Sequence, residues 1–261
     1  MNTLVFDIET VPDTDGARRL LELGNELTDG EVAELMFQRR RQATGGSDFL
    51  RHHLHRVVAI SVVLRDGADT LKVRSLGEPE DDEATLIDQF FRGIEHYHPT
   101  LVSWNGGGFD LPVLHYRGLL HGIQAPSYWD TGAGISEHRF NNYLGRFHWR
   151  HTDLMDALAG YQPRANVPLD EMATLMGFPG KMGMDGSKVW PAFQAGDVEG
   201  IRAYCETDVL NTWLVYLGFQ HFTGQLDGPM LEQEQARLAT LLAEDGRPHL
   251  REFLDAWRGE G

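Results

Sequence analysis

The sequence has little cysteine, no long apolar run and fewer basic than acidic residues. Its single cysteine, Cys205, excludes a disulfide within the chain, is typical of a reducing compartment, and is expected to be a small core residue. No segment approaches the roughly 18 apolar residues of a membrane-spanning helix. Asp7 interrupts the first apolar residues, so we expect no secretory signal. These absences predict a cytoplasmic protein without a membrane partner.

The charge balance argues against an extended nucleic-acid-binding surface. The chain has 23 Lys and Arg residues and 39 Asp and Glu residues, which gives a formal net charge of −16. Phosphate binding normally leaves a basic patch. An enzyme that holds only a few nucleotides needs just a local groove, and acidic blocks such as residues 78–83 can face away from it. The composition therefore permits short contacts with a strand and predicts weak, salt-sensitive binding.

Four carboxylates and one tyrosine lie in patterns that favour convergence. Asp7 and Glu9 alternate with apolar residues at the first expected strand, so both face the same side. Asp110 follows a glycine-rich turn after another apolar segment, and Asp208 lies one helical turn after Tyr204. Oxygen ligands without Cys or His suit Mg²⁺ or Mn²⁺ better than zinc, and two such ions are typical of phosphoryl transfer.

Each pattern alone also has an ordinary structural explanation. The Asp-x-Glu pattern occurs again at Asp81–Glu83, where it is typical of a solvated helix start. Asp110 suits a helix N-cap, and Tyr204 with Asp208 suits an ordinary helical face. The order of the patterns along one chain is what distinguishes them from these alternatives.

In that order, the segments Phe6–Thr10, Trp104–Asp110 and Tyr204–Asp208 resemble the DEDD family of 3′–5′ exonucleases. The resemblance is to the branch with tyrosine in the third motif (DEDDy), and especially to the proofreading exonuclease domains of family B DNA polymerases. It spans most of the chain to about residue 220, apart from an added segment near residues 13–55. No polymerase follows, so the resemblance implies a free-standing exonuclease.

The resemblance implies a metal-dependent 3′–5′ exonuclease that releases nucleoside monophosphates from single-stranded DNA. It implies two divalent cations, Mg²⁺ or Mn²⁺, with Asp7, Glu9, Asp110 and Asp208 as their ligands. Tyr204 is then expected to orient the attacking water, because a phenol with a pKa near 10 is a poor base unless perturbed.

Three further residues are candidates for seating the terminal nucleotide, namely Thr10, Asn105 and Phe109. Two alternatives stay open. The same site would trim RNA, since nothing in the sequence recognises or excludes a 2′-hydroxyl, although we favour a DNA 3′ end as partner. The second alternative is a non-catalytic nucleic-acid-binding accessory protein with the same fold. Such a protein is expected to lack at least one of the four carboxylates, and all four are present here.

The apolar periodicities predict one α/β domain over residues 1–261 with a ribonuclease-H-like (DnaQ-like exonuclease) fold. A hairpin, a crossover helix and a further strand beside the first predict a mixed five-stranded sheet flanked by helices. The expected strands are 3–8, 57–64, 70–76, 101–104 and 151–153. The expected helical segments are an insertion at 13–55, then 82–98, 168–176, 197–216 and the C-terminal helices within 225–261.

Two clusters of basic side chains are weaker candidates for substrate contacts. His52, His53 and His55 lack the partners of a zinc site and are interpreted as a solvated or substrate-neighbouring loop. Arg39–Arg41 falls at the end of an expected helix, where cations favour the helix dipole, with a phosphate-contacting patch as the alternative.

The segment 180–188 is rich in Gly and Met and is expected to be a mobile loop near the catalytic helix. Lys181 or Lys188 would there contact substrate phosphate, or both would be solvated. Asp153 and Asp156 are expected to cap the helix that follows them, outside the primary site.

Overall fold

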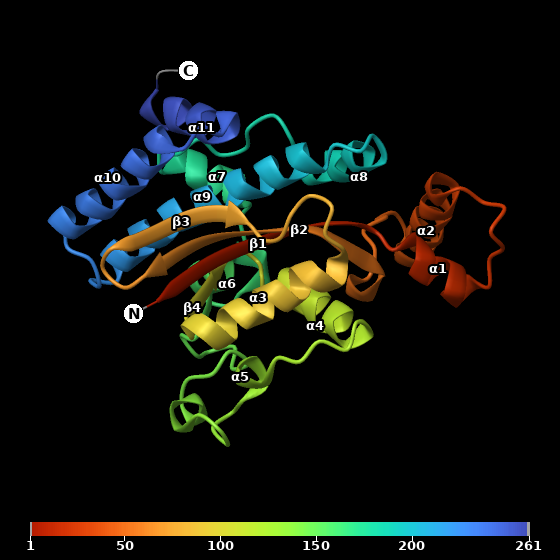
Figure 1. The fold of residues 1–261 in the computed structure, drawn as a ribbon, viewed down its shortest axis with the longest axis horizontal. Coiled ribbons are helices and arrows are strands. Elements are labelled where there is room, and N and C mark those ends of the chain that lie inside the picture. Colours follow the sequence, from red (N-terminus) through yellow and green to blue (C-terminus); the bar gives the residue numbers. More distant parts are fainter. Residues whose placement is uncertain (1, 260–261) are drawn as a thin grey trace.

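A computed structural model describes residues 2–259 as a five-stranded mixed sheet with helices on both faces (Figure 1). The strands are β1 Thr3–Pro12, β2 His55–Asp66, β3 Thr70–Ser75, β4 Thr100–Ser103 and β5 His151–Asp153. They lie in the order β3-β2-β1-β4-β5. The β1–β2 and β2–β3 pairs are antiparallel, whereas β4 is parallel to both β1 and β5. The predicted mixed sheet of a ribonuclease-H-like α/β fold is therefore confirmed.

The helices cover the two faces of this sheet and lie beyond one of its ends (Figure 1). Their bounds are α1 Thr14–Leu21, α2 Asp29–Thr44, α3 Glu83–Tyr97, α4 Asp110–Leu120, α5 Pro126–Trp129, α6 Leu154–Leu158, α7 Leu169–Leu175, α8 Gly186–Gln194, α9 Val198–Phe222, α10 Gly228–Glu244 and α11 Pro248–Arg258. Short 3-10 helices occur at His52–Leu54, Ser136–Arg139 and Pro163–Ala165. Within residues 2–259, no helix combines the length and the apolar character that crossing a membrane requires.

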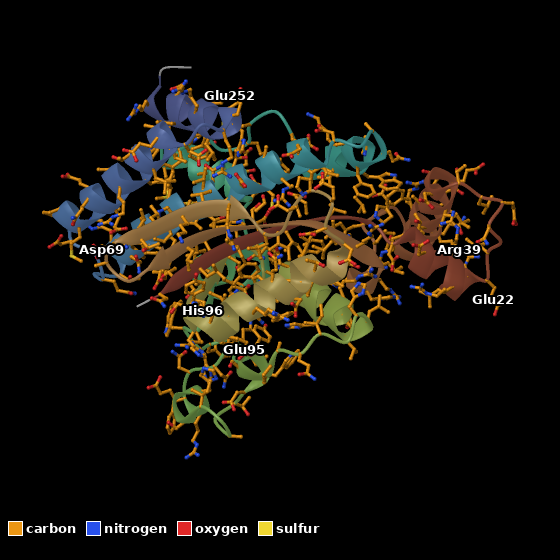
Figure 2. All side chains as sticks on the ribbon, viewed as in Figure 1. Glu22, Arg39, Asp69, Glu95, His96 and Glu252 are labelled. Atoms are coloured by element: carbon orange, nitrogen blue, oxygen red, sulfur yellow. The ribbon has the colours of Figure 1, made fainter. Side chains whose placement is uncertain are left out.

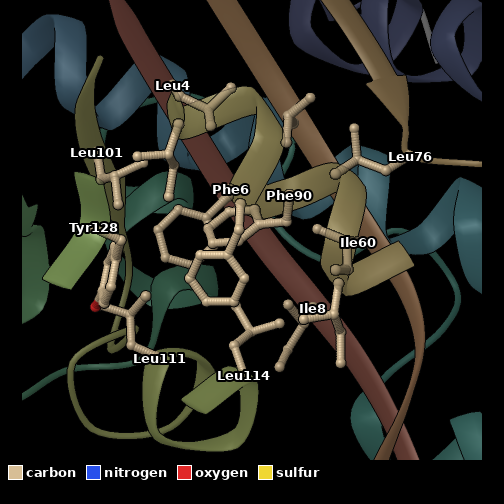
Figure 3. Packing of buried hydrophobic residues seen from close by; sticks show 14 of the residues in the cluster. Leu4, Phe6, Ile8, Ile60, Leu76, Phe90, Leu101, Leu111, Leu114 and Tyr128 are labelled. Carbon is tan, nitrogen blue, oxygen red and sulfur yellow. The ribbon is translucent and has the colours of Figure 1, made fainter. Parts of the chain in front are cut away.

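The alternation of β1 divides the core into two layers. Phe6 and Ile8 pack against α3 and α4, where the Phe6 and Phe90 ring centroids are 5.0 Å apart (Figure 3). Val5 faces the opposite way, into a second cluster with Trp213 of α9. Because successive side chains of a strand face opposite sides, the acidic positions of β1 face α9.

The first strand is longer than predicted, because it continues to Pro12 rather than ending near residue 8. Its pairing with β2 shifts register between Glu9 and Thr10. Such an irregularity bends and twists a strand and changes the direction of its side chains. The site residues of β1 therefore lie in the middle of an irregular, paired strand rather than at its end.

The predicted helical insertion consists of α1 and α2, which lie beyond one end of the sheet (red in Figure 1). Thr28 and Glu31 form a capping box at the start of α2. Gly45, with φ at 77°, ends α2 in the left-handed conformation that glycine adopts easily. Val32 and Met36 are buried in a small cluster of the insertion's own.

A buried arginine joins the start of the insertion to the core. Arg117 of α4 forms ion pairs with Asp13 and with Glu83. The backbone amide of Val57 also donates to Glu83, at 2.7 Å. The prediction of a solvated Asp81–Glu83 segment was thus wrong for Glu83, which is buried as an ion-pair partner, whereas Asp82 is the exposed N-cap of α3.

The C-terminal helices pack against α9. Leu250 and Phe253 of α11 are fully buried in the same cluster as α9 residues. Arg247 and His249 also meet the buried carboxylate of Glu206, each at 2.7 Å. This contact fixes α11 to the middle of α9.

Candidate functional site

Asp110 reaches β1 from the first turn of α4. Its Oδ1 accepts a hydrogen bond from the backbone amide of Ile8 at 3.1 Å, and the residue is only 4% exposed. The preceding turn is tight: Asn105 has a left-handed φ of 63°, and a Cβ on Gly106 would lie 2.3 Å from Oγ of Ser103. The small residues of this turn therefore allow the chain to place Asp110 beside the acidic positions of β1.

Helix α9 brings Asp208 to the same place. Burial raises the pKa of Asp7 well above its ordinary value, and the charges of Asp110, Glu9 and Asp208 raise it further. Asp7 and Asp208 are partly exposed, whereas Glu9 is 9% exposed. The structure thus gathers all four carboxylates predicted from the sequence at a site whose accessible side is formed by Asp7 and Asp208.

Crowding and burial perturb the other three carboxylates in the same direction. Burial raises the pKa of Glu9 well above its ordinary value, with Asp208 and Asp110 adding to the effect. Burial raises the pKa of Asp110 to about 7. It raises the pKa of Asp208 to about 6, while Tyr204 and Lys181 partly offset that rise. The metal-free site therefore favours bound protons, the expected behaviour of carboxylates that lack a counter-charge.

Other buried carboxylates in the protein have cationic partners. Glu83 pairs with Arg117, and Glu206 pairs with Arg247. None of the four site carboxylates forms an ion pair within residues 2–259. Since buried charges are normally paired or bound to metal, this set of hard oxygen donors fits divalent cations of the Mg²⁺ or Mn²⁺ type.

Tyr204 lies one turn before Asp208 and is buried. Burial raises the pKa of its phenol above the ordinary value, and the charges of Asp208, Glu9 and Asp7 act in the same direction. The hydroxyl group is therefore protonated at neutral pH. It is suited to donating and accepting hydrogen bonds rather than to acting as a base.

Cys205 was expected only to fill space in the core, and this interpretation was incomplete. The residue is fully buried, but its Sγ lies 3.4 Å from the carbonyl oxygen and 3.6 Å from Oδ2 of Asp7. Burial raises the pKa of the thiol, so it acts as a weak donor. The spacing of Cys205 and Asp208, three residues apart on one helix, was the signal that both share a face.

Two of the three predicted substrate-binding residues meet through a histidine. Oγ1 of Thr10 lies 2.9 Å from Nδ1 of His55, and the His55 and Phe109 ring centroids are 5.0 Å apart. Burial lowers the pKa of His55 to about 4, so the ring is neutral. Nε2 of His55 is 3.3 Å from the carbonyl oxygen of Leu50 and must donate there, which leaves Nδ1 to accept from Thr10.

The third predicted substrate residue, Asn105, is held by Asp153. The two carboxylate oxygens of Asp153 accept from the amides of Asn105 and Gly107, each at 2.9 Å. Asp153 also caps α6, as predicted, so the expectation that it lies outside the site was too narrow. Asn105 borders a hollow of about 490 Å³ that His115 and Trp149 also line.

The segment 180–188 differs from the expected loop, because α8 begins inside it at Gly186, with Asp185 as the N-cap. The positive charge of Lys181 offsets part of the rise in the pKa values of Glu9 and Asp208, so this charge lies near both carboxylates. Lys188 instead donates to the carbonyl oxygen of Gly183 at 2.8 Å.

Residues 47–257 match a protein family described as a predicted 3′–5′ exonuclease related to the exonuclease domain of PolB. The matched range contains Asp110, Tyr204 and Asp208, whereas Asp7 and Glu9 precede it.

The chain is also similar to parts of much longer proteins. It is 24% identical over 148 residues to the catalytic subunit of DNA polymerase epsilon from Saccharomyces cerevisiae, which covers 54% of this chain and 6% of that protein. Its structure resembles the family B DNA polymerase of the hyperthermophilic archaeon Pyrobaculum calidifontis, with a TM-score of 0.51 and 18% identity. That similarity covers 97% of this chain and 27% of the polymerase, and it shows a shared fold.

Proposed function

Because this chain belongs to the family of predicted 3′–5′ exonucleases related to the exonuclease domain of PolB, we propose that it hydrolyses phosphodiester bonds at 3′ ends of single-stranded DNA. Nucleoside monophosphates are the products. The observation that carries the proposal is the convergence of four carboxylates that have no ion pair in the described part of the chain, next to a protonated phenol. A purely structural acidic cluster would gain stability from a nearby arginine, as Glu83 does.

Asp7, Glu9, Asp110 and Asp208 are the residues that would hold two Mg²⁺ or Mn²⁺ ions. When bound, such ions increase the acidity of water near neutral pH and stabilise negative charge on the leaving 3′ oxygen. Because the pKa of Asp110 is raised to about 7, ion binding near neutral pH releases a proton from those molecules in which Asp110 is still protonated.

The remaining site residues position the reactants in this proposal. The Tyr204 hydroxyl orients the attacking water, since its raised pKa keeps the proton on the phenol. Lys181 places a positive charge near Glu9 and Asp208, where it can meet a substrate phosphate. Thr10 and Phe109 seat the terminal nucleotide, and Asn105 lies on the turn that positions Asp110.

The test is cleavage by purified protein of matched single-stranded DNA and RNA oligonucleotides, labelled at the 5′ end or at the 3′ end. We expect mononucleotide release from the 3′ end with Mg²⁺ or Mn²⁺ and none with chelator. The Asp7→Ala variant, purified in parallel, controls for contaminating nucleases. Mononucleotides released only from the 5′ end, or cleavage that survives chelation, would contradict the proposal.

The same assay separates the two remaining alternatives. Preference for RNA would identify an exoribonuclease with this site, because the two substrates differ mainly in the 2′-hydroxyl. Oligonucleotide binding without turnover under every metal condition would identify a non-catalytic accessory protein.

A further inference from the structure

The segment between α2 and β2 places an exposed aromatic ring beside the proposed site. Phe49 is 55% exposed, and its ring centroid lies 5.5 Å from that of Phe109, the residue before Asp110. His52 adds a second ring 5.9 Å from Phe109, and its Nε2 meets the carbonyl oxygen of Gly108 at 2.9 Å. An open aromatic surface therefore continues from the site to the insertion.

Three arginines extend this surface along the insertion. Arg39, Arg40 and Arg51 line a hollow of about 210 Å³ together with His53. Nε of Arg40 donates to the carbonyl oxygen of Phe49 at 2.7 Å, which connects the hollow to the aromatic surface. Figure 2 labels Arg39, a residue of α2, beyond the end of the sheet.

These three arginines differ from Arg18 and Arg41 of the insertion in their partners. Arg18 is neutralised by Asp29, and Arg41 by Glu34 and Asp48. Within residues 2–259, Arg39, Arg40 and Arg51 form no ion pair. They form a local positive surface on a chain whose net charge is −16, so the complementary occupant is an anion.

Exposed rings beside the arginines identify the class of anion. The His53 and Tyr116 ring centroids are 6.0 Å apart, and Tyr116 is 52% exposed. Cationic groups that alternate with exposed aromatic rings suit a single-stranded nucleic acid, whose phosphates pair with arginine and whose bases stack on rings. Neither a free anion nor a duplex offers both kinds of contact.

We propose that Phe49, His53, Tyr116 and the three arginines form a strand-guiding surface that binds the single-stranded segment upstream of the 3′ end. This proposal rests on the proposed exonuclease function. It adds a binding surface outside the catalytic site, to which α2 contributes Arg39 and Arg40. Helices α1 and α2 precede residues 47–257, so they lie outside the range that matches the family.

The test compares two triple variants with the same change in charge. Arg39→Gln/Arg40→Gln/Arg51→Gln removes the guiding arginines, and Arg74→Gln/Arg251→Gln/Arg258→Gln removes three exposed arginines elsewhere. Binding to a fluorescent single-stranded oligothymidylate of about 20 nucleotides is measured by anisotropy in chelator, at several salt concentrations. If three phosphate contacts are lost, the slope of log K against log salt should fall in magnitude by about 2 in the first variant only. Its affinity at low salt should fall by at least ~10-fold.

Two further measurements separate this surface from the active site. The first measurement is kcat/KM with metal on the long oligonucleotide and on a trinucleotide. The ratio of the long to the short value should be about 10-fold lower in the first triple variant than in the wild type, because a trinucleotide cannot span the surface. Phe49→Ala should lower affinity about 10-fold without changing the salt slope, because stacking is uncharged. Circular dichroism of each variant checks that it is folded.

Equal salt slopes in the two triple variants, with equal long-to-short ratios, would overturn the strand-guiding surface even if the wild-type protein cleaves normally. A wild-type protein that binds the oligonucleotide but never cleaves it would overturn the exonuclease function, and the salt slopes would still decide the surface. A wild-type protein that neither binds nor cleaves overturns both.

Discussion

The backbone amide of Ile8 donates to the side chain of Asp110 at 3.1 Å, across 102 residues of sequence. Ile8 lies between Asp7 and Glu9, so this bond fixes the distance from the helix α4 carboxylate to both carboxylates of β1. One oxygen of Asp110 is used for the bond, and the other stays available. Geometry at the proposed metal site thus depends on a main-chain contact as well as on side chains.

Asp7→Ala and Asp208→Ala should each abolish cleavage while leaving the protein folded. Each change removes a carboxylate from a crowded site where like charges repel, so the metal-free melting temperature should be unchanged or higher. Melting curves in chelator, measured beside cleavage rates, check this. Loss of activity accompanied by unfolding would instead assign these carboxylates a structural role.

Tyr204→Phe should slow turnover by roughly 10–1000-fold with little change in metal affinity, because the ring is kept and only the hydroxyl is lost. Asp208→Asn should weaken metal binding itself, so a higher Mn²⁺ concentration should partly restore its rate. Metal titrations of both variants on one labelled oligonucleotide distinguish the two roles. Wild-type turnover in Tyr204→Phe would falsify the role given to the hydroxyl.

Metal-free stability should depend on pH through the four site carboxylates, whose pKa values are all raised, and the contribution of Asp110 can be isolated by substitution. Its pKa is about 7 when folded and near 4 when unfolded, so between pH 4 and 7 the folded state binds more protons. Below about pH 4 its raised pKa therefore does not lower the free energy of unfolding. The destabilisation grows as the pH rises and reaches its full size above about pH 7. Burial lowers the pKa values of three histidines to about 4, namely those of His55, His115 and His151. Below about pH 6.5 the unfolded state binds more protons at these rings than the folded state does, so they reduce stability as the pH falls. The contribution of Asp110 is therefore measured as the difference in free energy of unfolding between a variant without this carboxylate and the wild type.

The free energy of unfolding of Asp110→Asn minus that of the wild type should increase as pH rises from 4 to 7. The asparagine cannot ionise, whereas the three histidines are common to both proteins and cancel. Urea denaturation in chelator at several pH values measures the difference. A difference independent of pH would show that the Asp110 pKa is not raised.

Asp153→Ala should lower kcat by about 10–100-fold without removing a metal ligand. The change frees the amides of Asn105 and Gly107, and the turn that positions Asp110 loses two hydrogen bonds. Asp156→Ala, on the same helix, is the matched control. Calorimetric titration with Mn²⁺ should show a weaker but still detectable site. Unchanged kcat in Asp153→Ala would limit Asp153 to capping α6.

Glu206→Ala should lower the free energy of unfolding by about 3 kcal/mol, because His249 loses its carboxylate partner, Arg247 keeps only Asp245, and the buried amide and hydroxyl of Ser75 lose their acceptor. Glu199→Ala, at an exposed position on α9, should cost less than about 1 kcal/mol. Equal effects in chemical denaturation would mean that the Glu206 contacts contribute no more than a surface residue does.

The sheet and most helices were predictable because their apolar residues follow the periods of strands and helices. The hairpin, the crossover helix α3 and the long helix α9 all appear near their expected bounds. Helix α8 was missed, since it contains Gly186 and Pro191, and packing of the buried Val189 compensates for their low helix propensity.

The candidate site was predictable as a set of residues but not as a set of contacts. Motif order pointed to the four carboxylates and Tyr204. The bonds from Asp153 to the turn and from Thr10 to His55 join residues 48 and 45 positions apart, and the burial of Glu83 depends on Arg117. Such partners are decided by tertiary packing, which no local pattern records.

The site is assembled from opposite ends of the described chain, and this sets when it forms during synthesis. Asp7 contacts Cys205 across 198 residues of sequence. A ribosome that adds about 5–20 residues per second therefore adds Cys205 roughly 10–40 s after Asp7. Until α9 emerges, the nascent polypeptide carries three of the carboxylates but neither Tyr204 nor Asp208. The proposed nuclease is therefore inert until α9 has been made and has left the ribosome, and fragments that end before α9 are inert as well.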